Sequence, residues 1–181
     1  FLHDHVSENG FIGFDSRTIS NDFARRIGEK VSEKHIRFAG DEDLVDLVWT
    51  DRPALSCEPL WELEPKFAGY TRAEKLEKVR EKMNELGADV FVIPALDEIA
   101  WLLNLRGGDV LYTPVFLSYL LLERGKATLC VQKEAVSAEI EAHLAADGVA
   151  LAPYDDIYPL VASLPKGTRA VSYTHLTLPT T

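Results

Sequence analysis

The chain has 181 residues, of which 46% are apolar and 27% charged, a composition typical of a soluble globular protein. Its formal net charge of −10 argues against nucleic-acid and anionic-membrane partners, because both need a basic protein face. No apolar run approaches the roughly 20 residues that a membrane-spanning helix requires. We therefore expect no nucleic-acid partner and no membrane span. The length allows one domain, or one domain plus a piece of another.

Both ends of the chain look unlike those of a native protein. Residue 1 is Phe, and residues 1–6 read like the end of a helix that has already begun. Residues 172–181 contain no Asp, Glu, Lys or Arg and resemble a translated sequencing adapter. We expect the chain to be a fragment with a non-native tail at 172–181.

The two cysteines, Cys57 and Cys130, lie far apart in the sequence without the spacing of metal ligands. We expect both to be buried free thiols, which suits a reducing cytoplasm. No secretory signal peptide is visible, so a cytoplasmic location is expected.

The first 53 residues predict a strand, a helix, a second strand and a short helix. The apolar run at residues 11–15 predicts a buried strand. Ser20 or Asn21 can cap the helix that follows, whose apolar residues recur every four positions: Phe23, Ile27 and Val31. Residues 35–38 favour a strand, and residues 43–48 favour a short helix with a wide apolar face.

Residues 53–65 contain three prolines and little periodicity, which indicates an extended linker packed in part through Leu60, Trp61 and Leu63. We place a domain boundary here.

The next helix has the strongest local signals. Thr71 and Glu74 have the spacing of a capping box, and Gly87 can end the helix in the left-handed conformation. The apolar stripe consists of Leu76, Val79, Met83 and Leu86. The charged positions are expected to form a solvated face: Glu74, Lys75, Glu77, Lys78, Glu81 and Lys82.

The remaining elements alternate between helices and strands. Strands are predicted at 88–94, 115–122, 127–131, 149–153 and from 169, with a hairpin turn at 123–126. Helices are predicted at 98–105, capped by Asp97, at 135–146 and at 154–164. This order favours an α/β fold, a three-layer α/β/α sandwich with a mixed sheet.

The sequence lacks a recognisable catalytic motif. Gly-x-Gly-x-x-Gly, P-loop and Gly-x-Ser-x-Gly motifs are absent from the sequence. His3 and His5 do not share a helix face. The carboxylates do not show the spacing of a two-metal hydrolytic site. We predict no catalytic residue and no metal ligand in this chain.

Residues 96–110 combine apolar residues with Trp, Asn, Arg, acids and two glycines. Trp101, Asn104 and Arg106 are therefore candidates for the rim of a substrate cleft, where an arginine can bind a carboxylate with two hydrogen bonds. In the alternative interpretation Trp101 belongs to the core, Asp97 caps the helix and Arg106 pairs with a nearby acid.

Three segments resemble a known family, two of them over ten or more residues. Leu-Asp-Glu-Ile-Ala-Trp-Leu-Leu-Asn-Leu-Arg-Gly at residues 96–107 is similar to a segment of the three-domain aminopeptidase P (Xaa-Pro aminopeptidase) family. Leu-Val-Asp-Leu-Val-Trp-Thr-Asp-Arg-Pro at residues 44–53 resembles another segment of the same family, and Ile-Gly-Phe-Asp at residues 12–15 a third, more loosely. The resemblance covers residues 1–171.

The resemblance implies that residues 1–53 end domain I and that residues 54–171 form a creatinase-N-like domain II. The family's catalytic "pita-bread" domain, with two divalent metal ions (Mn or Zn), would lie outside this chain. The parent would remove the first residue of peptides that carry proline at position 2. The present portion would be inactive alone, would shape the cleft and would support a homodimer.

Two other functions remain open. The parent could be a peptidase-like protein that has lost its metal ligands and acts as a non-catalytic protein-binding module. It could also be another pita-bread hydrolase, namely a creatinase or a prolidase. Metal ligands in the sequence downstream, which are Asp, Asp, His, Glu and Glu in such enzymes, would distinguish a peptidase from a binding module.

Overall fold

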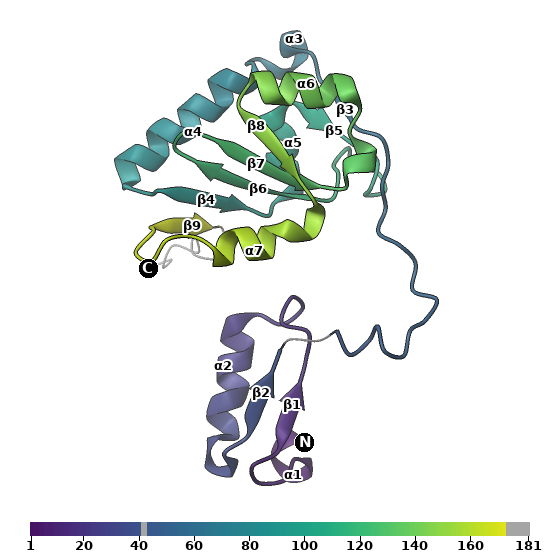
Figure 1. Ribbon diagram of the computed structural model, residues 1–181, viewed down its shortest axis with the longest axis vertical. Helices are drawn as coiled ribbons and strands as arrows, with labels where there is room; N and C mark the ends of the chain where they lie inside the picture. The colour runs from purple at the N-terminus through teal and green to yellow at the C-terminus, as the bar shows by residue number, and fades with distance from the viewer. Residues whose placement is uncertain (41–42, 173–181) are drawn as a thin grey trace. The chain divides into compact units, whose positions relative to one another are not determined.

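The computed structural model describes residues 1–40 and 43–172, and it divides into two compact units (Figure 1). The first unit is Phe1–Ala54 and the second begins at Leu55. Each unit is described by itself. Among the described residues no helix is long and apolar enough to cross a membrane.

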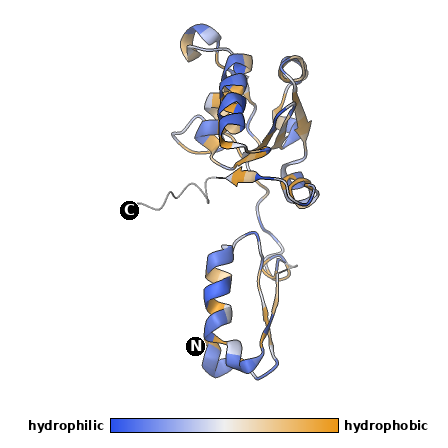
Figure 2. Cartoon of the chain, turned by 90° about the vertical axis from the view of Figure 1, so that its left-hand side faces the viewer, coloured by the Kyte–Doolittle hydropathy of each residue, from blue (hydrophilic) through white to orange (hydrophobic). Residues whose placement is uncertain are grey.

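The first unit is a small βαβ arrangement. Its elements are α1 (Leu2–His5), β1 (Phe11–Gly13), α2 (Asn21–Lys30), a 3-10 turn (Ser32–Lys34) and β2 (Arg37–Ala39). β1 and β2 pair in parallel. The Ser20 hydroxyl caps α2 by accepting from the Phe23 N–H at 3.2 Å, as predicted. Hydrophobic bands separated by hydrophilic turns mark α2 in Figure 2.

The predicted short helix at residues 43–48 is wrong, because residues 44–48 form turns. The cause is local competition for backbone donors. The Asp43 carboxylate accepts from the N–H groups of Val45 (3.0 Å) and Asp46 (3.3 Å), as in an Asx turn. Arg52 then binds the carboxylates of Asp43 and Asp46, which fixes the turn. The apolar side chains in this segment remain largely exposed.

The second unit is built on a five-stranded mixed sheet in the order β8-β7-β6-β4-β9. The strands are β4 (Val90–Ile93), β6 (Ser118–Glu123), β7 (Ala127–Val131), β8 (Val149–Ala152) and β9 (Ala170–Ser172). β6 runs antiparallel to both β4 and β7, whereas the outer pairs β4–β9 and β7–β8 are parallel. The predicted hairpin between β6 and β7 is confirmed.

Successive residues of each strand point to opposite faces of the sheet, and the two faces have separate cores. Phe91, Leu120 and Leu129 belong to the larger core, packed against α4 (Arg72–Leu86), α5 (Leu96–Leu103) and α6 (Ala138–Ala146). Val92, Leu121 and Cys130 belong to the smaller core, packed against α7 (Ile157–Ala162) (Figure 1). The predicted three-layer α/β/α fold with a mixed sheet is thus confirmed, with unequal outer layers.

The predicted ends of α4 are confirmed. Thr71 and Glu74 form a complete capping box, and Gly87 ends the helix with φ 65°. Of the predicted apolar stripe, Leu76 and Met83 are buried, but Leu86 is 62% exposed because it lies at the last residue of the helix. Lys75, which was expected on the solvated face, is also buried.

The chain around α5 differs from the prediction. α5 begins at Leu96 after Ala95, and Asp97 does not cap it. It ends at Leu103, since Leu105–Arg106 form strand β5, which pairs antiparallel with β3 (Trp61–Glu62) in the predicted linker. The pairing shows why the linker is packed at its end: Leu60, next to β3, is buried.

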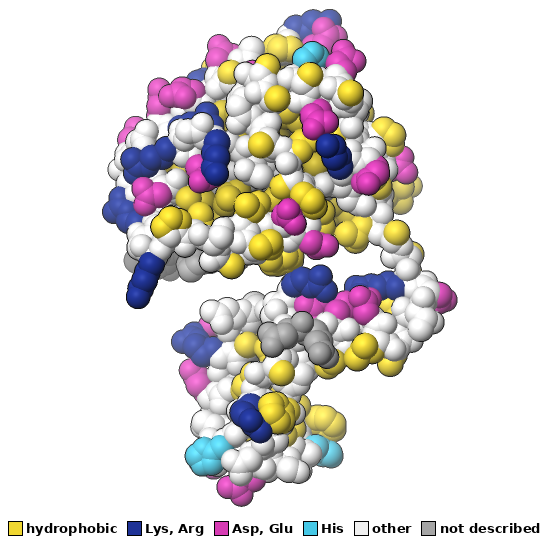
Figure 3. Space-filling model, viewed as in Figure 1, with side chains coloured by type: hydrophobic (Ala, Val, Ile, Leu, Met, Phe, Trp, Pro, Cys, Tyr) yellow, Lys and Arg dark blue, Asp and Glu magenta, His cyan; other side chains and the backbone are white. Residues whose placement is uncertain are grey.

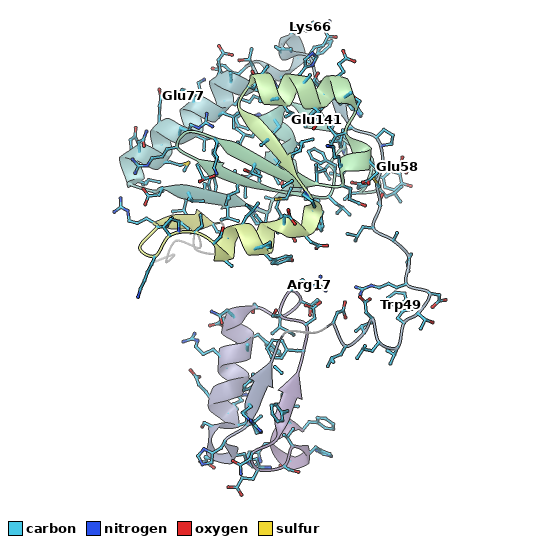
Figure 4. All side chains as sticks on the ribbon, in the orientation of Figure 1. Arg17, Trp49, Glu58, Lys66, Glu77 and Glu141 are labelled. Atoms are coloured by element: carbon cyan, nitrogen blue, oxygen red, sulfur yellow. The ribbon has the colours of Figure 1, made fainter. Side chains whose placement is uncertain are left out.

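Residues 108–117 form a loop, so β6 begins at Ser118 rather than at the predicted residue 115. One oxygen of the Asp109 carboxylate accepts from the Leu117 N–H at 2.8 Å, and the other from the Glu58 N–H at 3.0 Å. Glu58 lies on the segment that leads into the second unit (Figure 4). Asp109 thereby ties this loop to the linker.

Further short elements complete the second unit: α3 (Pro65–Ala68) and 3-10 turns at Lys133–Ala135 and Tyr154–Asp156. The predicted helix at 135–146 begins later, at Ala138, because Ser137 is its cap.

Cys130 is buried, as expected, whereas Cys57 is exposed, against expectation. Of the predicted tail at 172–181, Ser172 ends β9 and the rest lies outside the described residues.

The capping box at the start of α4 should contribute measurably to the stability of the protein. Thr71→Ala removes the hydroxyl that accepts from the Glu74 N–H, so we expect a loss of about 1 kcal/mol in the free energy of unfolding by urea. Thr71→Ser, which keeps the hydroxyl, is the control and should stay close to wild type. Equal losses in both variants would contradict the capping role.

The two units should differ in stability. In the first unit Val31 is the only buried core side chain among the described residues, and an isolated two-stranded sheet is marginally stable. Amide protons of α2 should therefore exchange with solvent much faster than those of β6 or β7 in hydrogen-exchange mass spectrometry. Equal protection of the two units would contradict this expectation.

Candidate functional site

The three predicted rim residues lie at and just after the end of α5. Asn104 follows α5 in the left-handed conformation (φ 54°, ψ 31°), which asparagine tolerates better than most residues. Its N–H points back to the carbonyl oxygens of Ala100 and Trp101. The turn at Asn104 redirects the chain from α5 into β5, where Arg106 lies opposite Trp61.

Three cationic side chains bind carbonyl oxygens at the end of α5. Lys75 Nζ lies 2.8 Å from the Trp101 oxygen, and Arg72 Nε lies 2.8 Å from the Leu103 oxygen. Arg106 Nη1 donates to the Ala100 oxygen at 2.7 Å. The last four carbonyls of a helix lack partners within it and carry the negative end of its dipole, so cations there are stabilising.

Lys75 is the most deeply buried of the three cations, with 1% of its surface exposed. Its ammonium also donates to Asn104 Oδ1 at 2.7 Å and lies 4.2 Å from the centre of the Trp101 ring. Burial, and then the charge of Arg106, lower the pKa of Lys75. The Asn104 amide group donates in turn to the Tyr70 carbonyl at 2.9 Å. Lys75 thus connects two of the predicted rim residues.

Arg72 links α5 to a second group of charges. Its Nη2 lies 2.6 Å from Glu62 Oε1 and its Nη1 lies 2.8 Å from Asp147 Oδ2, while the other oxygen of Glu62 lies 2.8 Å from His143 Nδ1. These side chains line a pocket of about 410 Å³ together with Asn104. The group joins β3, α4 and the end of α6.

The Glu62–His143 contact changes the pKa values of both partners. The hydrogen bond to Glu62, and then its charge, raise the pKa of His143 above its ordinary value of 6.5. Burial pulls the pKa of Glu62 upward, but hydrogen bonds from His143 and Arg72 outweigh burial and leave it below 4.5. The charged forms of both groups are therefore favoured by folding.

A second pocket, of about 480 Å³, lies beside α5. Val79, Phe91, Ile93 and Leu102 supply its apolar lining. Trp101, Asp97 and Glu98 complete it. The Trp101 side chain is 50% exposed, so it is not a fully buried core residue as the alternative interpretation expected.

The predicted rim residues do not share one pocket. Trp101 lines the larger pocket and Asn104 the smaller, and Arg106 lines neither of the two. The alternative interpretation expected Arg106 to pair with an acid, but within residues 1–40 and 43–172 it instead donates to the backbone oxygens of Ala100 and Leu105. The assignment of Trp101, Asn104 and Arg106 to a cleft rim stays a prediction.

Sequence reasoning missed Lys75, Arg72, Glu62 and His143 as a connected set. A signal for the first two was present: continuing the Leu76–Val79–Met83 stripe backwards by four residues reaches Arg72 and Lys75. Glu62 and His143 lie 81 positions apart, and no local pattern brings them together.

The described part of the chain contains no group of three or more His, Cys, Asp or Glu residues that could hold a metal ion.

Charged side chains of both signs are interspersed over the face of the second unit in Figure 3.

Replacing Lys75 tests the helix-end arrangement. Lys75→Met keeps the length of the side chain but leaves Asn104 Oδ1 without its buried donor, so we expect a loss of about 1–3 kcal/mol in the free energy of unfolding. Lys82→Met is the matched control, because Lys82 is exposed on the same helix and should change stability by less than about 0.5 kcal/mol. Equal effects would contradict the role given to Lys75.

The Glu62–His143 pair predicts a pH dependence. The charge of His143 stabilises the fold below its unfolded pKa of 6.5, and this contribution is lost as the pH rises through the raised folded value. The charge of Glu62 contributes above 4.5 and is lost as the pH falls through its lowered folded value. The two charges together therefore contribute most to the stability of the fold between pH 4.5 and 6.5.

The corresponding measurement compares wild type with His143→Ala by urea unfolding at two pH values. The variant should lose more stability at about pH 5.5 than at about pH 8.5. A loss that does not change with pH would show that the charges of the pair do not contribute.

Comparisons with known proteins add three findings. The family model described as "Creatinase/Prolidase N-terminal domain" matches residues 51–179. A probable Xaa-Pro aminopeptidase P from Neurospora crassa is 40% identical over 133 residues, which is 73% of this chain and 19% of that protein. Xaa-Pro aminopeptidase 1 from Dictyostelium discoideum is 35% identical over 180 residues, which is 94% of this chain and 28% of that protein.

A solved structure is also similar to this chain. The X-prolyl aminopeptidase of Caenorhabditis elegans, described as a cytosolic enzyme with a di-nuclear active site, matches with a TM-score of 0.76 and 30% sequence identity. The match covers 89% of this chain and 26% of that one. The chain thus spans about a quarter of the length of the relatives that it matches. Because the family model covers most of the sequence, the chain belongs to the creatinase/prolidase N-terminal domain family.

Proposed function

We propose that this chain is the non-catalytic N-terminal portion of an Xaa-Pro aminopeptidase, an enzyme that releases the first residue of peptides with proline at position 2. The observation that carries the proposal is the likeness to the C. elegans X-prolyl aminopeptidase, with a TM-score of 0.76 over 89% of this chain. The same function is named for the Neurospora and Dictyostelium relatives. Residues 1–53 would end domain I, and residues 54–171 would form domain II.

The proposed chemistry belongs to the rest of the parent enzyme. Two divalent metal ions, Mn or Zn, would supply a bound hydroxide and stabilise the developing oxyanion. The described residues lack a set of three or more ligands to hold such ions, so they do not fit the metal site and no step is assigned to them. Their role would be to shape the cleft, to restrict the peptides that enter and to support a homodimer in the cytoplasm.

A chimera tests this proposal directly. Residues 1–171 of this chain would replace the matching segment of the C. elegans enzyme, and release of the first residue from Xaa-Pro peptides would be measured. We expect kcat/KM within about tenfold of the parent enzyme, because relatives at this identity keep one backbone and its packing. A folded, metal-loaded chimera without activity would contradict the proposal.

The rim assignment is tested in the same chimera. Arg106→Ala and Trp101→Phe should each lower kcat/KM for Xaa-Pro peptides if these side chains face the peptide. Arg124→Ala is the matched control, because Arg124 is exposed on the β6–β7 hairpin and pairs with Asp89. Unchanged kcat/KM in the first two variants would refute the rim role and leave the enzyme assignment intact.

The alternative functions make different predictions for the sequence of the parent gene. A downstream domain without Asp, Asp, His, Glu and Glu as metal ligands would favour a protein-binding module. A domain that keeps them but prefers creatine or dipeptides as substrate would favour a creatinase or a prolidase.

A further inference from the structure

The pocket of about 480 Å³ beside α5 has two carboxylates next to an apolar lining. Its apolar side chains come from three elements, with Val79 on α4, Phe91 and Ile93 on β4, and Leu102 on α5. Asp97 and Glu98 lie in the first turn of α5 and line the same pocket. The pocket volume is about 480 Å³, enough for a side chain rather than for water alone.

Both carboxylates lie in the first turn of α5, where the helix dipole favours negative charge, but they lack side-chain partners among the described residues. No side chain caps the first turn of α5, and among the described residues neither Asp97 nor Glu98 forms an ion pair or accepts a hydrogen bond. Glu98 is half-buried. Burial, and then the charge of Asp97, raise its pKa, so the ionised form is held in an unfavourable position. A cation placed between the two acids would relieve both effects.

The lysines of the neighbouring helix do not supply that cation. Lys75 binds the Trp101 oxygen and Asn104, Lys78 lies 3.3 Å from the centre of the Tyr70 ring, and Lys82 pairs with Glu85 at 2.7 Å. Each of these ammonium groups therefore has another partner. The negative charge in the pocket remains available to a cation from outside the chain.

The Trp101 side chain adds a preference for one kind of cation. It lines the pocket with half of its surface exposed. Because the Lys75 ammonium already lies 4.2 Å from the centre of this ring, an added guanidinium would have to stack on the exposed part of the indole. A planar guanidinium can stack on an aromatic ring while it donates two hydrogen bonds to a carboxylate, which an ammonium cannot do. The aliphatic stem of an arginine would contact the apolar lining, as long basic side chains do elsewhere.

We propose that this pocket binds the arginine side chain of a peptide, with the guanidinium between Asp97, Glu98 and Trp101 and its stem against Val79 and Leu102. The proposal rests on the proposed function only in naming a peptide as the carrier of the arginine. It adds to that function a binding site for one basic residue of a peptide.

The experiment uses the 181-residue chain and follows its backbone and indole N–H signals by NMR. The probe is the tripeptide Gly-Arg-Gly, acetylated and amidated so that the side chain carries its only charge. The matched probe replaces arginine by citrulline, which has nearly the same shape and no charge. A third probe replaces it by lysine.

We expect saturable shifts at Asp97, Glu98, Trp101 and Leu102 with the arginine peptide. Binding of the citrulline peptide should be about tenfold weaker or more, because its urea group lacks the charge. The lysine peptide should bind less tightly than the arginine peptide. The double variant Asp97→Asn with Glu98→Gln should weaken arginine binding by about tenfold or more, while its spectrum shows that the fold is kept.

Glu141→Gln is the control variant, because it removes one carboxylate charge from the half-buried α6 residue labelled in Figure 4, which pairs with Lys133 away from this pocket, and should leave binding unchanged. The proposal is overturned by equal binding of arginine and citrulline peptides, by shifts outside the pocket, or by no saturable shift. Such a result would leave the proposed aminopeptidase function untouched, since no catalysis is measured. Failure of the chimera would leave the peptide binding intact.

Discussion

The end of α5, held by Lys75, Arg72 and Arg106, is the constraint on which the second unit depends. These cations bind the carbonyl oxygens of Trp101, Leu103 and Ala100. Buried carbonyls without donors would each cost free energy comparable to a lost hydrogen bond. Because two of the cations come from α4, the same contacts fix α4 against α5 on the larger core. The turn at Asn104 then places β5 beside β3, and so anchors the end of the linker.

Local signals in the sequence were sufficient for much of this fold. The capping box at Thr71 and Glu74 and the left-handed Gly87 define the ends of α4 because they act within one turn. The continuous apolar runs along β4, β6 and β7 predict strands that are covered on both faces, and the two cores show that cover. Asp43 shows the limit, since a carboxylate that binds its own backbone overrides a helical apolar pattern.

The candidate site was harder to predict because its contacts join distant parts of the chain. Trp101, Asn104 and Arg106 are residue types that often occur at functional sites. In the structure each takes part in a hydrogen bond at the end of α5. Lysine is a residue type that usually lies in solvent, but Lys75 occupies a buried position on α4. Its position follows from the helical stripe, but its partners, Trp101 and Asn104, come from another helix. Pairs such as Glu62 and His143 depend on the whole fold.

The arrangement also shows which charged side chains of the second unit join its elements. Arg72, Glu62 and Asp147 join helices, strands and the predicted linker, whereas Asp97 and Glu98 line the pocket beside α5. Membership of the creatinase/prolidase N-terminal family accounts for a stable α/β unit without a metal-ligand cluster among its described residues. The proposed chemistry belongs to the remainder of its longer relatives.

The most direct test of the helix-end clamp is a double-mutant cycle between Lys75→Met and Asn104→Gly, measured as the free energy of unfolding. Glycine keeps the left-handed conformation at residue 104 and removes only the side chain that Lys75 binds. If the clamp is as described, the two substitutions will be non-additive, with a coupling energy of about 1 kcal/mol or more. Additive effects, with a coupling energy near zero, would contradict it.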